Sequence, residues 1–142
     1  MDAAIRLARA TGRRGEVPVG AVVVSGGRIV GRGANRTIGA HDPTAHAEIV
    51  ALRRAARAAR NYRLTGATLY VTLEPCLMCL GAMVHARIER LVFGARDPKV
   101  GGTSLLRRAR RGLNHRFELR GGVRAEAAAE LLREFFRRRR SG

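Results

Sequence analysis

The stretch of sequence that decides the fold is ATLYVTLEPCLMC, residues 67–79. Its first seven residues include two threonines, a valine and a tyrosine, a composition that favours a β-strand. Pro75 then predicts the start of a helix, because proline has no amide hydrogen to lose in a first turn and its φ angle is already helical. Cys76 and Cys79 are three residues apart, so on that helix both thiols share one face and can reach one metal ion. We therefore expect a strand that leads into a metal-binding helix.

The stretch HDPTAHAE, residues 41–48, adds an imidazole and a carboxylate. Asp42 and Pro43 predict a second helix start, with Asp42 as the cap, and a run of good helix formers extends to about Arg60. His46 and Glu48 are two residues apart on that helix and point in different directions. This spacing predicts different roles, with His46 as a metal ligand and Glu48 as a proton carrier.

Together the two stretches supply one imidazole, two thiolates and a spare carboxylate. A zinc ion held by His46, Cys76 and Cys79 would keep one open position, as catalytic sites do, whereas structural zinc is closed by four ligands. Free amide groups in the first turn of a helix favour negative charge, which lowers the pKa of Cys76. The pattern His-x-Glu … Pro-Cys-x-x-Cys is the signature of zinc-dependent nucleobase deaminases.

Two other interpretations of the cysteines remain open. Thiol–disulfide oxidoreductases also present a Cys-x-x-Cys motif after a strand, although their chemistry needs neither His46 nor Glu48. A structural zinc site would need a fourth ligand, for which His41, His85 and His115 are the candidates. Structural zinc of this kind stabilises chains that are too short for a core.

This chain has 142 residues, and we expect residues 1–142 to form one deaminase domain with its own core. Both cysteines belong to the metal motif and none remains for a disulfide, which indicates a reducing compartment and predicts a cytoplasmic protein. No apolar stretch reaches the length of a membrane span, so no membrane association is expected. The first nine residues predict an amphipathic helix that packs on the domain; an organelle transit peptide is the alternative.

The formal net charge is +17, which points to a polyanionic partner. Two arginine clusters stand out, at residues 107–111 and 137–140. Each cluster alone could be a solvated face. Lys99 is the only lysine, so compositional bias of the genome explains part of the arginine excess. Beside a nucleobase deaminase motif, the charge favours RNA.

Helices and strands are expected to alternate along the chain. The predicted fold is a three-layer α/β/α sandwich on a mixed five-stranded sheet, antiparallel at a hairpin with a Gly-Gly turn and parallel where helices cross over. A loop rich in glycine and arginine is expected over residues 100–111. The last helix carries an apolar stripe, which is either a core face or, at its end, partly exposed for stacking on bases. The expected strands are 17–24, 28–33, 67–73, 90–94 and about 117–119; the expected helices are 1–12, 43–60, 75–83 and a last helix with Ala128, Leu131, Leu132, Phe135 and Phe136 on its stripe.

Several stretches outside the metal motif resemble the bacterial tRNA-specific adenosine deaminases. The zinc motif alone would also fit cytidine, deoxycytidylate and guanine deaminases, so the flanking stretches favour the tRNA enzyme. The resemblance extends over nearly the whole chain. It is carried by EVPVGAV at 16–22, NR at 35–36, HDPTAHAE at 41–48, YVTLEPC at 70–76, VFGARD at 92–97, NHR at 114–116 and FFR at 135–137.

The resemblance implies a cytidine-deaminase-like fold, a homodimer, and conversion of the wobble adenosine to inosine in the anticodon stem-loop of arginine tRNA. It implies one zinc ion per chain on His46, Cys76 and Cys79, proton transfer by Glu48 and contact of Asn35 with the flipped base. A turn residue that ends a strand is the plainer interpretation of Asn35. The functional alternatives are a guanine, cytidine or deoxycytidylate deaminase acting on a free base or nucleotide, and a non-catalytic, zinc-stabilised RNA-binding module.

Overall fold

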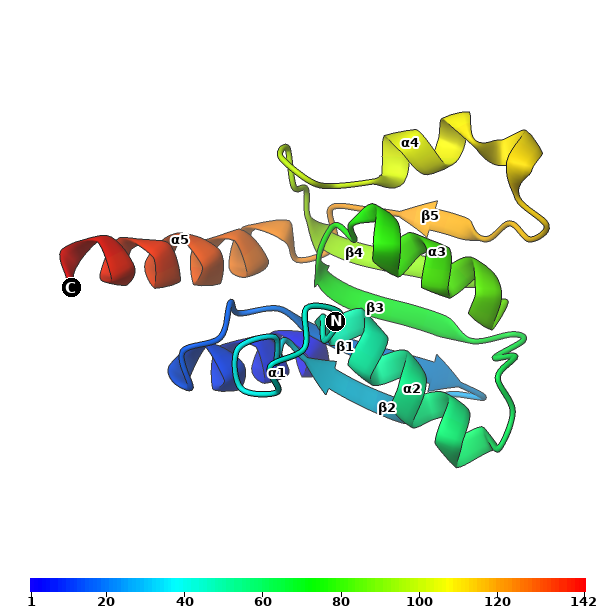
Figure 1. The fold of residues 1–142 in the computed structure, drawn as a ribbon, viewed down its shortest axis with the longest axis horizontal. Coiled ribbons are helices and arrows are strands. Elements are labelled where there is room, and N and C mark those ends of the chain that lie inside the picture. The colour runs from blue at the N-terminus through cyan, green and yellow to red at the C-terminus, as the bar shows by residue number, and fades with distance from the viewer.

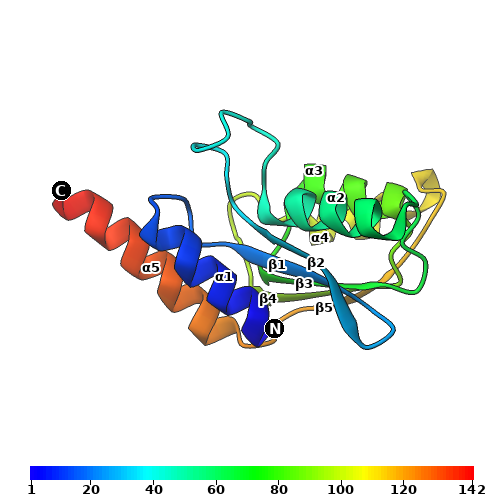
Figure 2. The same ribbon diagram turned by 90° about the horizontal axis from the view of Figure 1, so that it is seen from below.

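The computed structural model describes residues 1–142, apart from the side chain of Arg110. A mixed five-stranded sheet in the order β2-β1-β3-β4-β5 lies between two layers of helices, which confirms the predicted sandwich (Figures 1 and 2). Helices α1 (Asp2–Arg13) and α5 (Ala125–Ser141) lie side by side on one face. Helices α2 (Ala47–Ala59) and α3 (Leu77–Ala86) cover the other face, with the short α4 (Thr103–Arg108) beside α3. The strands are β1 (Gly20–Ser25), β2 (Arg28–Ala34), β3 (Thr68–Leu73), β4 (Arg90–Ala95) and β5 (Glu118–Arg120).

The strand directions bring three chain segments to one edge of the sheet. β1 pairs antiparallel with both β2 and β3, while β4 runs parallel to β3. Gly26 and Gly27, with φ angles of 57° and 76°, form the tight turn of the predicted hairpin. The carboxyl ends of β2, β3 and β4 therefore meet at the same edge, where open α/β sheets usually place their ligands.

Helix α2 packs unusually close to β2 because the strand offers two glycines to it. A Cβ atom at Gly31 would lie 2.4 Å from the carbonyl oxygen of Ala51, and one at Gly33 would lie 2.3 Å from that of Ala47. The alanines of α2 and the glycines of β2 thus bring two backbones into contact. This contact fixes the start of α2, where His46 lies.

Helix α3 is anchored by a fully buried face. Leu80 and Met83 are 0% exposed and belong to the same apolar core as Leu69 and Leu91 of the central strands. The segment that carries Cys76 and Cys79 is therefore held by core packing at the centre of the sheet.

Both predicted helix starts were wrong by a few residues. Helix α2 begins at Ala47, with His46 as its N-cap, because the carboxylate of Asp42 accepts the amide and the hydroxyl of Thr44 and forms a local turn instead of a cap. Helix α3 begins at Leu77, with Cys76 as its N-cap, two residues after Pro75.

The segment 100–111, predicted to be a loop, contains all of α4 and the first part of a 3₁₀ helix at Arg110–Gly112. The prediction for α5 holds in its inner half, where Ala128 is buried. Phe135 is half-buried and Phe136 is 43% exposed, so the apolar stripe reaches the surface near its end. None of the helices described is both long and apolar enough to span a lipid bilayer.

Candidate metal centre and active site

The segment that leads into α2 is held by Asn35 at the end of β2. The side-chain oxygen of Asn35 accepts the amide hydrogen of Ala47 at 3.0 Å and so caps α2 from twelve residues away. The Thr11 hydroxyl donates to the Asn35 carbonyl at 2.9 Å, and the Arg36 amide donates to the Ala45 carbonyl at 2.9 Å. These bonds close the intervening loop and leave His46 in an extended conformation at the N-cap.

His46 and Cys76 occupy equivalent positions in two helices. Both are N-cap residues with extended backbones, at φ −70° and ψ 154° for His46 and φ −75° and ψ 171° for Cys76. Cys79 lies in the first turn of α3 and is completely buried. The three side chains form one group whose possible ligand atoms all lie within 4.8 Å of one another.

The spacing of this group fits a zinc ion. The His46 Nδ1 atom lies 3.6 Å from Cys76 Sγ and 3.5 Å from Cys79 Sγ. Usual zinc bond lengths of about 2.3 Å to sulfur and about 2.05 Å to nitrogen, at a tetrahedral angle, require an N···S separation of about 3.6 Å. The residues can therefore hold zinc without rearrangement and would leave its fourth position open.

The electrostatics of the three side chains suit a cation. Two hydrogen bonds lower the pKa of Cys76 to about 3, the one with Cys79 having the larger effect and the one with His46 the smaller. The thiolate thus formed raises the pKa of His46 and, together with burial, that of Cys79. The pair of cysteines consequently shares one negative charge until a metal ion replaces the remaining thiol proton.

Glu48 lies outside the group of possible ligands but next to it. Its side chain is 4% exposed. Burial raises the pKa of Glu48, and its own backbone amide, Cys79 and His46 act against this rise. A carboxyl whose pKa is raised above its ordinary value takes up a proton more readily, which suits it to proton transfer.

The other histidines do not complete a four-ligand site. Among the described residues, the group holds His46 and the two cysteines only. His41 and His85 are exposed, and the Nε2 atom of His115 lies 2.7 Å from the Ile88 carbonyl oxygen.

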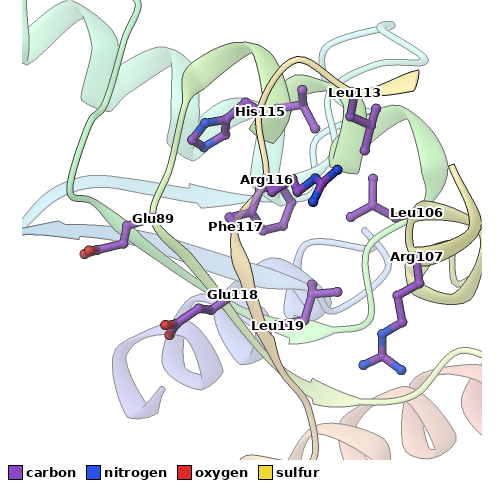
Figure 3. A pocket seen from close by; sticks show the side chains of 10 residues that line it. Glu89, Leu106, Arg107, Leu113, His115, Arg116, Phe117, Glu118 and Leu119 are labelled. Carbon is purple, nitrogen blue, oxygen red and sulfur yellow. The ribbon is translucent and has the colours of Figure 1, made fainter. Parts of the chain in front are cut away.

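Figure 3 shows His115 beside a separate cavity of about 430 Å³, whose lining includes the apolar Leu106, Leu113, Phe117 and Leu119. Glu89 and Glu118 point away from these apolar side chains. None of the side chains of His46, Cys76 and Cys79 lines this cavity.

A wide groove lies at the sheet edge where β3 and β4 end. It has a volume of about 990 Å³ and lies between α5 and the segment that follows β4. We call it the α5 groove; its lining includes Arg96, Lys99, Arg133, Arg137 and Arg140 as cations, Asp97 and Glu130 as anions, and the apolar Leu73 and Phe136. The groove is therefore basic, with one exposed aromatic ring.

Two buried carboxylates were not assigned a role from the sequence. Glu16, 6% exposed, accepts the amides of Ile38 and Gly39 at 3.3 and 2.6 Å and so holds the loop before His46. Glu74, 8% exposed, accepts donors from the segment after β4. Burial opposes ionisation of Glu74, but hydrogen bonds from Thr103 and Asp97 outweigh it and keep the pKa of this carboxyl below its ordinary value. The sequence signal that could have revealed these two residues is a charged residue beside an apolar strand. Such a charge is expected to be buried, and a buried charge requires hydrogen-bond partners.

Known proteins resemble this chain in sequence and in fold. The family model of MafB19-like deaminases matches residues 1–140. The tRNA-specific adenosine deaminase of Haemophilus influenzae is 50% identical over 99% of this chain and 83% of its own. A solved structure from a study of A-to-I editing by tRNA:A34 deaminases superposes with a TM-score of 0.89 at 45% identity, covering 93% of this chain and 97% of that one.

The chain belongs to the family of tRNA-specific adenosine deaminases. Guanine deaminases are more distant neighbours: the enzyme of Nitrosomonas europaea superposes with a TM-score of 0.78 at 26% identity, covering 93% of this chain and 80% of that one. Membership makes this protein a hydrolytic deaminase. It also excludes the oxidoreductase interpretation of the Cys-x-x-Cys motif, because these relatives are deaminases.

Proposed function

We propose that this protein converts adenosine to inosine at the wobble position of a tRNA anticodon, with an arginine tRNA as substrate. The observation that carries the proposal is the group of His46, Cys76 and Cys79 beside the buried carboxyl of Glu48. The group occurs in a chain that is 50% identical to a tRNA-specific adenosine deaminase. The choice of an arginine tRNA as substrate rests on the sequence resemblance described above.

We expect one zinc ion per chain on His46, Cys76 and Cys79. When bound, zinc supplies Lewis acidity that activates a water molecule at neutral pH. The spacing of the nitrogen and sulfur atoms supports this choice of metal.

Glu48 is proposed to move the protons of the hydrolysis. It takes one proton from the attacking water and passes it to N1 of adenine while the water oxygen bonds to C6. It then transfers the proton of the new C6 hydroxyl to the amino nitrogen. The C6–N bond breaks, ammonia departs, and a carbonyl remains at C6. Burial of Glu48 supports this role, because it raises the pKa of the carboxyl and so favours uptake of a proton from the water.

Asn35 is proposed to contact the flipped base. Its side-chain oxygen is already committed to the amide of Ala47, which fixes the orientation of the amide group. The NH₂ group is then left to donate to the base. This position lies immediately before the loop that ends at His46.

The α5 groove is proposed to hold the RNA backbone around the target base. Its cations suit phosphates, and the exposed ring of Phe136 offers a surface for stacking. A loop nucleotide loses less stacking than a paired one when it leaves the helix, which favours an anticodon loop over a duplex.

A homodimer is also proposed. Leu77 at the start of α3 and Leu105 in α4 are 57% and 50% exposed, on neighbouring helices of the same layer. Large apolar side chains grouped on a surface are typical of subunit contacts.

The proposal is tested with purified, zinc-loaded protein on an anticodon stem-loop, the same loop with a cytidine target, and free adenosine, cytidine and guanine. We expect inosine in the adenosine stem-loop and poor turnover of the free compounds. Binding energy from the RNA backbone should contribute to turnover, so shortening the stem-loop should lower kcat as well as raise KM. A preference for free guanine or cytidine would exclude the tRNA substrate and leave the deaminase chemistry intact. Binding of the stem-loop without any product would favour the RNA-binding module.

A further inference from the structure

The carboxylate of Glu74 is the centre around which the segment between β4 and α4 folds. Its Oε1 atom accepts the amide hydrogen of Asp97 at 3.1 Å. Its Oε2 atom accepts the amide hydrogen of Thr103 at 3.2 Å and the hydroxyl of Thr103 at 2.6 Å. Three donors from the two ends of one segment therefore converge on one buried carboxylate.

The interior of this segment is also fitted to Glu74. A Cβ atom at Gly101 would lie 2.5 Å from Cδ of Glu74, so only glycine fits there. The carboxylate of Asp97 accepts the amides of Lys99 and Val100 at 3.0 and 3.2 Å, which makes the turn compact. We call residues 96–103 the Glu74-bound turn.

The Glu74-bound turn connects the metal centre with the α5 groove. On one side, Gly102 donates its amide hydrogen to the carbonyl of Pro75 at 2.9 Å, directly before Cys76. On the other side, Arg96 and Lys99 of the same turn line the α5 groove. Glu74 itself lies two residues before Cys76, so one side chain bonds the turn to the segment that carries the metal ligand.

We propose that Glu74 is a positioning residue that fixes the cations of the α5 groove relative to Cys76. It touches neither the base nor the metal; it sets where Arg96 and Lys99 can meet the RNA backbone when the target base is at the metal centre. This inference rests on the proposed function, in which the α5 groove binds RNA.

Glu74→Gln is the central variant, because it keeps the shape of the side chain but places an NH₂ group against the amide of either Asp97 or Thr103. We expect the zinc content and the kcat at saturating stem-loop to stay at the wild-type level. KM for the stem-loop should rise about tenfold, because losing charge-assisted hydrogen bonds lowers the fraction of molecules with the turn in place. Hydrogen exchange should accelerate at the amides of Asp97 and Thr103 and stay unchanged in α2.

Double mutants separate positioning from a general loss of stability. In a Lys99→Ala background the effect of Glu74→Gln on KM should shrink, because the cation that Glu74 positions is gone. In an Arg140→Ala background, where the missing cation belongs to α5, the effect should remain in full. Glu89→Gln is the matched control, at an exposed glutamate just before β4 and thus at the opposite end of that strand from the turn. It should change neither KM nor exchange.

Thr103→Val provides a milder variant if Glu74→Gln folds poorly, and Thr103→Ser should restore the wild-type KM. An unchanged KM in folded, zinc-loaded Glu74→Gln, or an equal effect in the Lys99→Ala and Arg140→Ala backgrounds, overturns the proposal. If the wild-type protein neither binds nor deaminates the stem-loop, the proposed function has failed. The exchange rates at Asp97 and Thr103 then decide alone whether Glu74 anchors the turn.

Discussion

At the scale of single residues, two of the three candidate metal ligands precede their helices rather than lie in them. An N-cap residue has an extended backbone, so its side chain can project beyond the helix end. His46 and Cys76 both do this, and the first turn of α3 adds Cys79. Glu48 lies in the first turn of α2, close to the group without belonging to it.

Glu48→Gln should retain the metal and lose turnover. The amide has nearly the same shape as the carboxylate and is not required as a ligand, so the zinc content should stay near one per chain. Loss of the proton carrier should lower kcat by a factor of about 10² to 10⁴. Zinc analysis and single-turnover kinetics on the stem-loop measure both quantities. Cys79→Ala, the contrasting variant, should lose zinc and stability; loss of zinc from Glu48→Gln would exclude the role given to this residue.

Glu74 should make stability depend on pH in the acid range. Its pKa in the folded protein is below the ordinary value of 4.5, so the folded state favours the ionised form. The resulting stabilisation is complete above the unfolded pKa and is lost as the pH falls through the folded pKa. Thermal melting of zinc-loaded wild type and Glu74→Gln from pH 7 to pH 3 tests this. The difference in Tm should be largest near neutral pH and should narrow below about pH 4.5, the unfolded pKa; a constant difference would contradict it.

At the scale of secondary structure elements, the close contact of α2 with β2 positions His46. Gly33→Ala would place a Cβ atom 2.3 Å from the Ala47 carbonyl oxygen and 2.5 Å from the Ala51 amide nitrogen. Helix α2 would have to move, and we expect a loss of about 1–3 kcal/mol in stability from overpacking, with weaker zinc binding. Gly81→Ala in α3 is the matched control. Its Cβ atom meets no other atom within 4 Å, so this change should be neutral or stabilising by about 1 kcal/mol. Urea unfolding and competition with a zinc chelator provide the measurements.

Much of the secondary structure could be predicted from the sequence, because the hairpin, the strands and the buried faces of the helices depend on local patterns. The Gly26-Gly27 turn and the strand before Pro75 are such cases. The start of α2 could not be predicted, because the side chain that caps it is that of Asn35, twelve residues before Ala47. The carboxylate of Asp42, which the sequence predicted as the cap, forms a local turn with Thr44 instead.

The site residues likewise include some that the sequence could predict and some that it could not. The metal group is encoded in two short motifs, so the sequence could place His46, Cys76 and Cys79 together. Helix α4 lies in a run rich in glycine and arginine, with little pattern to reveal it. The partners of Glu74 are 23 and 29 positions away in sequence, and no local rule identifies them.

At the scale of the whole molecule, the charge is distributed less simply than the sequence suggested. Glutamates of α5 pair with arginines of the same helix: Arg133 with Glu126 and Glu130, Arg138 with Glu134. Arg139 stacks on the ring of Phe135 at 5.2 Å. The predicted cluster at 137–140 is thus partly engaged within its own helix, and the cluster at 107–111 includes Arg110, whose side chain lies outside the described part of the structure.

The exposed leucines predict where two copies of the chain meet. Leu105→Arg should convert a dimer into a monomer, because burying an unpaired guanidinium against apolar side chains is unfavourable. Light scattering coupled to size exclusion measures the change. Val100→Arg, at another exposed apolar position that lines the α5 groove, is the control and should leave the mass unchanged. A Leu105→Arg variant that stays dimeric would place the contact elsewhere on the surface. A monomeric wild type would show that the two copies do not meet.

The basic surfaces differ in position, and the salt dependence of RNA binding can distinguish them. If the α5 groove holds phosphates, log Kd of the stem-loop rises linearly with log salt, and each lost contact lowers the slope by about 0.7 for single-stranded RNA. Replacing Arg96, Lys99 and Arg140 with alanine should therefore flatten the slope by up to about 2. Replacing Arg107 and Arg108 of α4 is the matched comparison. Arg107 lines the cavity of Figure 3, which none of the side chains of His46, Cys76 and Cys79 lines. Loss of the two arginines should therefore leave the slope near the wild-type value. If instead the α4 pair flattens the slope and the groove set does not, the RNA crosses α4, and the groove cations belong to a solvated surface.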